Sequence, residues 1–178
     1  MSRIAVASGI GTILAIVSAP ARGADVVVYD STSAQQLVNL MREFGYAGEP
    51  QTTAAGRPWI RGQLGANGFW VNLHECGEAW QHCKSVQFAA GFAVKDKPAP
   101  QAIDEWNATY RWAHASVDAD GDPFLRMDAG VHGVTDDYFT KMFTTWNRML
   151  TMFLRAFVLR PSGPTPPGGS GLVTTTGR

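Results

Sequence analysis

Two stretches of the chain carry apolar residues at every third or fourth position, which predicts two amphipathic helices. The first stripe follows a run of hydroxyl residues that can cap a helix and consists of Leu37, Leu40, Met41 and Phe44. The second follows Thr135 or Asp136 and consists of Phe139, Met142, Phe143, Trp146, Met149, Leu150, Phe153, Leu154 and Phe157. Basic residues recur every seven positions on its opposite face, at Lys141, Arg148 and Arg155. A long helix this apolar must be buried, against a sheet or against another copy of the chain.

Between these helices, apolar and polar residues alternate in short runs that predict strands. We place strands near 49–53, 58–64, 68–75 and 84–94, then a short helix at about 101–109, then strands at 111–117 and 124–129. An Asn-Gly pair at 67–68 and an Asp-Gly pair at 120–121 are typical of tight hairpin turns. The order is therefore helix, three or four strands, helix, two strands, helix. This order predicts an α+β domain with an antiparallel sheet flanked by helices.

The two ends of the chain differ in composition from this domain. Residues 1–24 combine Arg3, an apolar run over 4–17 and small residues at 19–21, the layout of a cleaved secretory signal peptide. A membrane anchor is the alternative, but a spanning helix needs about 20 apolar residues. Residues 161–178 are rich in Pro, Gly, Ser and Thr, which predicts a disordered tail. We therefore expect one folded domain over 25–160, no membrane span after cleavage, and a periplasmic or secreted protein.

The charge balance argues against nucleic acid and anionic membranes as partners. Fifteen Lys and Arg residues match fifteen Asp and Glu residues, so no net field steers the chain towards a polyanion. Aromatic residues make up 11% of the chain and include six Trp, which favours a packed globule over disorder.

Two cysteines, Cys76 and Cys83, are separated by six intervening residues in a chain with the pattern of an export signal. The alternation of the flanking strands places both at the mouth of one hairpin and on its more polar face. In an oxidising compartment such a pair favours a structural disulfide. The alternative is a metal or redox site with His74 and His82, but the spacings C-x2-C and H-x3-H are absent. We expect the disulfide, and no metal or other cofactor.

No pattern predicts catalysis. The acidic turn at 118–122 resembles a calcium loop, but its sixth and twelfth positions are Pro123 and Ala129, where an EF-hand needs Gly and Glu. The chain has no G-x-S-x-G sequence, and its four histidines lie in no catalytic motif. We therefore expect no enzyme.

Three tryptophans in the strand region form a candidate interaction surface: Trp59, Trp70 and Trp80. Alternation places Trp70 on the side away from Phe69, Val71 and Leu73. Two interpretations stay open, because such residues are either covered by a helix or exposed as a patch for a partner or a second copy.

Several motifs, in this order, resemble the YbjN-like family of bacterial sensory transduction regulators. They are Gly-Arg-Pro-Trp-Ile-Arg-Gly at 56–62, Gly-Phe-Trp-Val at 68–71, Cys76, Cys-Lys-Ser-Val-Gln-Phe at 83–88, Trp-Asn at 106–107, the Asp-Gly-Asp hairpin within 118–128, and Gly-Val-Thr-Asp at 133–136. The resemblance covers about 31–159. It implies a fold similar to type III secretion chaperones and a small module that binds protein, often as a dimer. It transfers no catalytic residue.

The sequence thus favours an exported, non-enzymatic, chaperone-like or regulatory module that binds an unidentified protein, with a homodimer as one expected assembly. We expect its sheet and last helix to present an apolar groove to the partner. Two alternatives stay open. One is a metal-binding or redox protein that uses His74, Cys76, His82 and Cys83. The other is a purely structural envelope protein.

Overall fold

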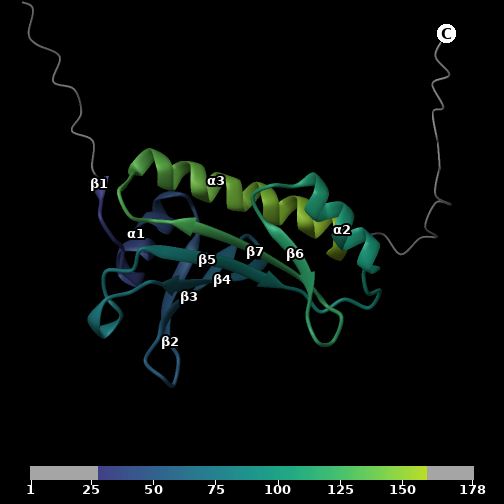
Figure 1. Ribbon diagram of the computed structural model, residues 1–178, viewed down its shortest axis with the longest axis horizontal. Helices are drawn as coiled ribbons and strands as arrows, with labels where there is room; N and C mark the ends of the chain where they lie inside the picture. The colour runs from purple at the N-terminus through teal and green to yellow at the C-terminus, as the bar shows by residue number, and fades with distance from the viewer. Residues whose placement is uncertain (1–27, 160–178) are drawn as a thin grey trace, which may run out of the picture.

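The computed structural model describes residues 28–159 and shows a six-stranded antiparallel sheet with three helices (Figure 1). The strands lie in the order β2-β3-β4-β5-β7-β6. Their bounds are β2 Ala47–Thr52, β3 Pro58–Leu64, β4 Asn67–His74, β5 Ser85–Gly91, β6 His114–Val117 and β7 Pro123–Gly130. The helices are α1 Ala34–Glu43, α2 Pro100–Thr109 and α3 Asp136–Phe153, which continues as a π-helical turn over Leu154–Val158. The predicted α+β class and element order are confirmed.

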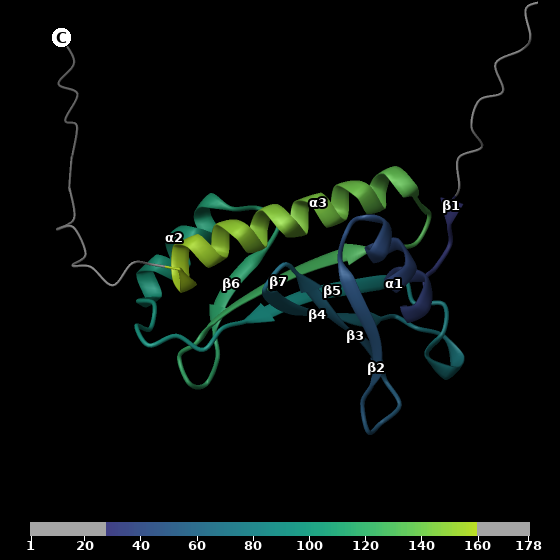
Figure 2. The ribbon, with the colours of Figure 1, turned by 180° about the vertical axis from the view of Figure 1, so that it is seen from behind.

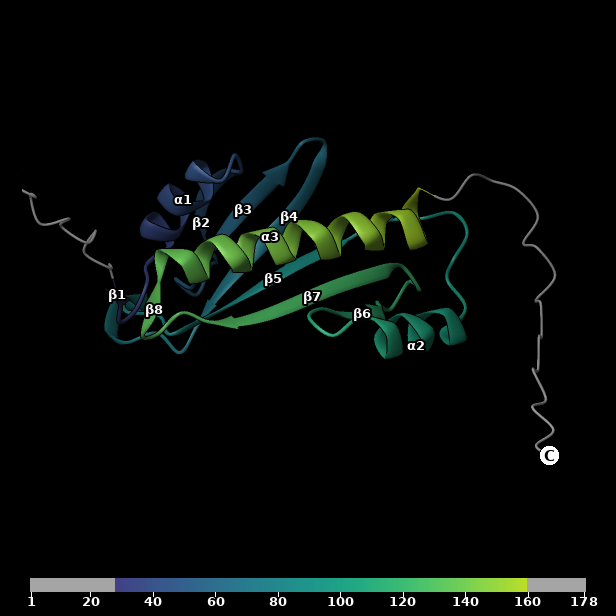
Figure 3. The same cartoon turned by 90° about the horizontal axis from the view of Figure 1, so that it is seen from above.

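The helices leave one side of the sheet open. α3 runs along one side in both Figure 1 and Figure 2, and Figure 3 shows α1 over the β2 and β3 end of that same side. α2 lies beside β6 at the opposite edge of the sheet. Among the elements of 28–159, no helix lies across the other side. Strand residues there, such as Arg61 and Arg126, are exposed.

Local sequence signals determine where α1 and α3 begin. The Ser33 hydroxyl accepts a hydrogen bond from the Gln36 N–H, and the Gln36 side chain accepts one from the Ser33 N–H, a capping box. α1 ends before Gly45, whose φ of 77° is the left-handed conformation that favours glycine. At α3, the Thr135 hydroxyl accepts from the Tyr138 N–H. These signals were the basis of the predicted boundaries, which the structure confirms.

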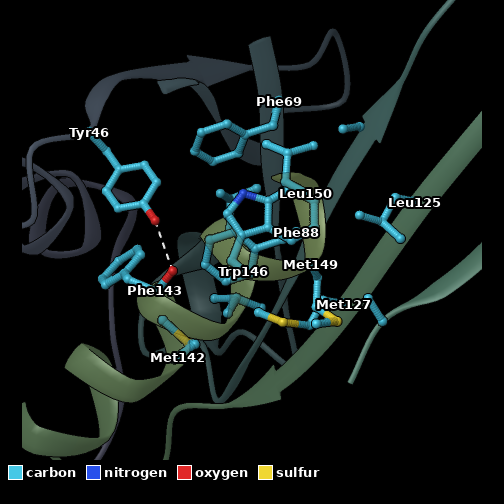
Figure 4. Packing of buried hydrophobic residues seen from close by; sticks show 14 of the residues in the cluster. Tyr46, Phe69, Phe88, Leu125, Met127, Met142, Phe143, Trp146, Met149 and Leu150 are labelled. Carbon is cyan, nitrogen blue, oxygen red and sulfur yellow. Dashed lines mark hydrogen bonds between the residues drawn. The ribbon is translucent and has the colours of Figure 1, made fainter. Parts of the chain in front are cut away.

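The core lies between α3 and the helix-facing side of the sheet (Figure 4). Trp146 is fully buried, and its ring centroid lies 5.6 Å from that of Phe69 and 5.3 Å from that of Phe88. The Tyr46 hydroxyl donates a 2.8 Å hydrogen bond to the Phe143 carbonyl oxygen, and burial raises the pKa of Tyr46 to about 12. α3 is therefore the helix whose side chains fill the centre of the domain.

Three details of the predicted strands were wrong. β5 ends at Gly91, three residues before the predicted end at 94. β6 begins at His114 instead of 111, because residues 111–113 bend away from β7 to join α2. A short pair, β1 Val28–Tyr29 with β8 Val134–Thr135, was not predicted at all. Each segment of this pair has two residues, which is too short for a period-2 pattern.

The predicted placement of the cysteines on the polar face was also wrong. Cys83 is fully buried and belongs to the core. It precedes β5 and exchanges two 2.9 Å backbone hydrogen bonds with Thr32, so the alternation of β5 does not extend to it. Cys76 follows the end of β4 and is half-buried. Side-chain alternation holds only within a strand, and both cysteines lie outside one.

Some expectations fall outside the described part of the chain. The signal peptide at 1–24 and the tail at 161–178 both lie beyond residues 28–159. Within 28–159, none of the helices combines the length and the apolarity that crossing a bilayer requires.

Candidate functional site

The disulfide predicted from the sequence is present between Cys76 and Cys83. The loop that it closes carries three of the four non-glycine residues with positive φ found in 28–159, and the fourth, Glu75, directly precedes it. These three are Ala79 at 51°, Trp80 at 59° and His82 at 54°. Such conformations cost L-residues on the order of 1 kcal/mol each. The disulfide and the Thr32–Cys83 bridge connect this loop to the rest of the domain at its end.

The two histidines near the disulfide do not form a ligand set with it. His74 Nε2 is buried without a hydrogen-bond partner among the described residues, and His82 Nδ1 lies 3.2 Å from Ser31 Oγ. Both sulfur atoms are bonded to each other, so in this form neither can supply a thiolate ligand. Across 28–159, no three His, Cys, Asp or Glu side chains come together as a group that could hold a metal ion.

The three tryptophans chosen from the sequence do not form one continuous surface. Trp59 and Trp70 are half-buried on the open side of the sheet, where the Trp70 ring packs edge-on against Phe124 with centroids 5.2 Å apart. Trp80 lies in the disulfide loop and is 38% exposed, with the Arg57 guanidinium 5.4 Å from its ring. Trp59 and Trp70 thus share a face, and Trp80 contacts the turn between β2 and β3 instead. Their role in binding stays a prediction.

A fourth tryptophan, not chosen from the sequence, is the most exposed large hydrophobic residue of 28–159. Trp112 is 66% exposed and lies in the segment between α2 and β6. Two alanines that the predicted strand places on its inward face, Ala113 and Ala115, are buried in the structure. That alternation points Trp112 away from the core, which was the signal available in the sequence.

Trp112 separates two hollows in the surface. The first, which we call the apolar hollow, lies between β7 and α3 and has a volume of about 420 Å³. It is lined by Trp112, Met127, Asp128, Ala129, Tyr138, Lys141, Met142 and Thr145. The second, the basic hollow, has a volume of about 460 Å³ and is lined by Asn107, Tyr110, Arg111, Trp112, Ala113, His114, Arg126, Met127 and Asp128. The apolar hollow occupies the place where a groove between the sheet and the last helix was expected.

The hollows exist because β6 is shorter than β7. The Asn107 side chain donates a 3.0 Å hydrogen bond to the Ala115 carbonyl and accepts a 2.8 Å bond from the Ala115 N–H. This pair of bonds attaches α2 to β6 and draws the preceding residues away from β7. Only β7 residues 123–126 pair with β6. The rest of β7, Met127 to Gly130, has no strand on its outer side within residues 28–159, and Met127, Asp128 and Ala129 of it line the hollows.

The sequence model of the YbjN family, described as "Putative bacterial sensory transduction regulator", matches residues 33–158. The chain belongs to the YbjN family. The match begins at Ser33, the N-cap of α1, and ends at Val158, the last residue of the π-helical turn. The YbjN domain therefore contains the whole six-stranded sheet, all three helices and both hollows. No curated protein and no solved structure matches the chain.

Among residues 28–159, the shifted pKa values all have causes in the neighbouring structure. The Tyr29 hydroxyl donates a 2.7 Å hydrogen bond to Asp136 Oδ1, and this bond and burial raise the Tyr29 pKa to about 12. The hydrogen bond from Lys97, with another from the Val94 N–H, lowers the pKa of Asp122. Asp118 Oδ1 accepts from two backbone N–H groups of its own turn. The carboxylates of Asp118 and Asp122 thus stabilise the hairpin turn by accepting backbone hydrogen bonds, which is the usual role of Asp in such turns.

Proposed function

We propose that this YbjN protein is an exported, non-enzymatic module that binds another protein through the surface around Trp112. The observation that carries the proposal is the 66% exposure of Trp112 between two hollows whose walls are a strand and a helix of the core. Keeping a large apolar ring in water is unfavourable, and the Trp112 ring adjoins the apolar hollow, so the two together form the kind of apolar surface that a partner covers. Trp, Tyr, Met and Arg are the residue types enriched in protein interfaces, and the two hollows contain all four.

The chemistry of the hollows favours protein over nucleic acid. The basic hollow contains two arginines, Arg111 and Arg126, and one carboxylate, Asp128. Lys141 in the apolar hollow pairs with Asp137. So few uncompensated charges provide a poor footprint for a phosphate backbone, whose binding depends on several cations at once.

Export and regulation are the remaining parts of the proposal. The N-terminal pattern of the sequence and the Cys76–Cys83 disulfide both favour an oxidising compartment, periplasmic or extracellular. The family description supports a regulatory role. A sheet covered by helices on one side only is suited to chaperone-like contact. The partner is a protein of another sequence or a second copy of this chain.

A capture experiment with matched tryptophan variants tests the proposal. Tagged wild-type protein, Trp112→Ala and Trp80→Ala are incubated with envelope extract of the native bacterium, and bound proteins are identified by mass spectrometry. Removing a central aromatic contact typically costs about 2 kcal/mol or more, so Trp112→Ala should reduce capture by on the order of thirtyfold. Trp80→Ala is the control, because Trp80 is exposed but lies outside both hollows, and it should capture normally.

Two results would contradict this proposal. Equal recovery of the same protein by wild type and Trp112→Ala would show that the surface around Trp112 does not bind it. Loss with Trp80→Ala and not with Trp112→Ala would place the binding surface at the tryptophans chosen from the sequence.

A further inference from the structure

Among residues 28–159, the outer edge of β7 presents backbone groups without partners. The Val131 N–H donates to the Lys84 carbonyl oxygen at 2.7 Å, so odd-numbered positions at this end of β7 face β5. The Ala115 N–H and C=O point to Asn107, away from β7. The β6 residues on either side of Ala115 therefore form the hydrogen bonds to β7, and they lie opposite its even-numbered positions. Alternation then directs the N–H and C=O of Asp128 and Gly130 outwards. Within residues 28–159, no hydrogen bond reaches these outward groups, and both residues are exposed.

The other two edges of the sheet are protected. Asn107 occupies both outward groups of Ala115 on β6. On β2, the Thr53 N–H donates to the Arg57 carbonyl oxygen, so the backbone groups of the even-numbered positions point away from β3. One of these positions is Pro50, which has no N–H to offer to another strand. Proline and covering side chains are common means of keeping an edge from pairing with another strand. The edge at Asp128 and Gly130 lacks such a device, and the two hollows flank it.

The surroundings of this edge define what a strand placed there would need. A residue opposite Met127 or Ala129 would face α3 and enter the apolar hollow, next to Tyr138 and Met142. A residue opposite Asp128 would face the open side, beside Arg126. The basic hollow holds two guanidinium groups, Arg111 and Arg126, against the one carboxylate of Asp128, so the excess charge on this side is positive.

We propose that the partner binds by adding an extended strand to β7 at Asp128 and Gly130, with an apolar side chain in the apolar hollow and an acidic side chain near Arg111 and Arg126. The inference rests on the proposed function and specifies its partner as an extended acidic peptide segment. Backbone hydrogen bonds supply part of the affinity in this mode, and the pockets for alternate side chains supply selectivity. The edge is four residues long and only Asp128 and Gly130 in it are exposed. So short an edge offers little area for two copies of the whole domain, which favours a peptide segment as occupant.

A proline substitution separates backbone from side-chain recognition. Asp128→Pro removes the outward N–H and places a ring where the added strand would lie, while the bonds from Met127 and Ala129 to β5 remain. Asp128→Ala is the matched control, because it removes the carboxylate and keeps the N–H. The probe is a fluorescein-labelled peptide, acetyl-Thr-Val-Glu-Ile-Thr-Val-Thr-amide, read out by fluorescence anisotropy on the full chain. A second peptide with Lys in place of Glu tests the charge.

The expected results are saturable binding to wild type, at least a tenfold loss with Asp128→Pro, and no loss with Asp128→Ala, which keeps the N–H and removes a negative charge beside the acidic side chain of the peptide. The Lys peptide should bind at least fivefold more weakly. Circular dichroism establishes whether Asp128→Pro is folded. As a measurement that needs no variant, the peptide should slow amide hydrogen exchange of Asp128 and Gly130 in wild type by at least tenfold.

Several outcomes would overturn the strand addition. They are absence of peptide binding to wild type, equal loss with Asp128→Ala and Asp128→Pro, or unchanged exchange at Asp128 and Gly130. A dimer in size-exclusion chromatography with light scattering whose exchange is already slow at both residues would assign the edge to a second copy. If Asp128→Pro captures the native partner normally while Trp112→Ala does not, protein binding stands and strand addition is wrong.

Discussion

Trp146→Ala is expected to lower the free energy of unfolding by about 3–5 kcal/mol, the cost of truncating a large buried aromatic residue. Trp146 is fully buried at the centre of the face that α3 presents to the sheet, where its ring contacts those of Phe69 and Phe88 (Figure 4). These two rings lie on adjacent strands, so the substitution leaves a cavity between both layers of the domain. Urea denaturation monitored by far-ultraviolet circular dichroism measures the change.

Two controls distinguish core packing from a general effect of losing tryptophan. Trp146→Phe keeps a ring in the cavity and removes an indole N–H that has no hydrogen-bond partner among the described residues, so it should cost about 1 kcal/mol. Trp112→Ala should change stability by less than about 0.5 kcal/mol, because Trp112 is exposed. A loss below about 1 kcal/mol for Trp146→Ala would contradict the packing of α3 on the sheet.

Replacing both cysteines, Cys76→Ala with Cys83→Ala, is expected to lower the free energy of unfolding by about 2.5 kcal/mol. This is the loop-closure entropy for a ring of about eight residues. Loss of the buried Cys83 sulfur adds a smaller term of the same sign. The same urea denaturation measures the change. His82→Ala is the control, since it lies in the same loop and leaves the covalent ring intact; it should cost less than about 0.5 kcal/mol.

Thiol titration of protein purified without reductant tests the disulfide in solution and the metal or redox alternative together. If the disulfide forms in solution, neither the native nor the unfolded protein will contain a reactive thiol. Two reactive thiols accompanied by bound zinc would contradict the structural role and favour the site at His74, Cys76, His82 and Cys83.

The elements with strong local signals could be predicted from the sequence. α3 combines a capping residue with nine apolar positions in register, and β3 lies between Pro58 and Gly65, so its bounds match the prediction. Both signals act over a few residues along the chain. Such elements form in the same way whatever the rest of the fold does.

The start of β6 and the burial of Cys83 could not be predicted in this way, because both depend on contacts between different elements of the fold. Asn107 of α2 draws the chain away from β7, and Thr32 pairs with Cys83 across 51 positions. Trp112 was missed for the same reason. Its ring borders two hollows only because β6 begins after it. The alternation of the predicted strand places Trp112 on the outside of the domain. It does not indicate which surface the ring forms there.

Photo-crosslinking in living cells tests the central claim most directly, that this YbjN protein works by contact with another protein at the Trp112 surface. Tyr138, which is 36% exposed and lines the apolar hollow, is replaced by p-benzoylphenylalanine. Val117, 47% exposed and outside both hollows, is replaced in the control. We expect one defined protein adduct in the envelope fraction from position 138 and none from position 117. No adduct at 138, or the same adducts from both positions, would contradict it.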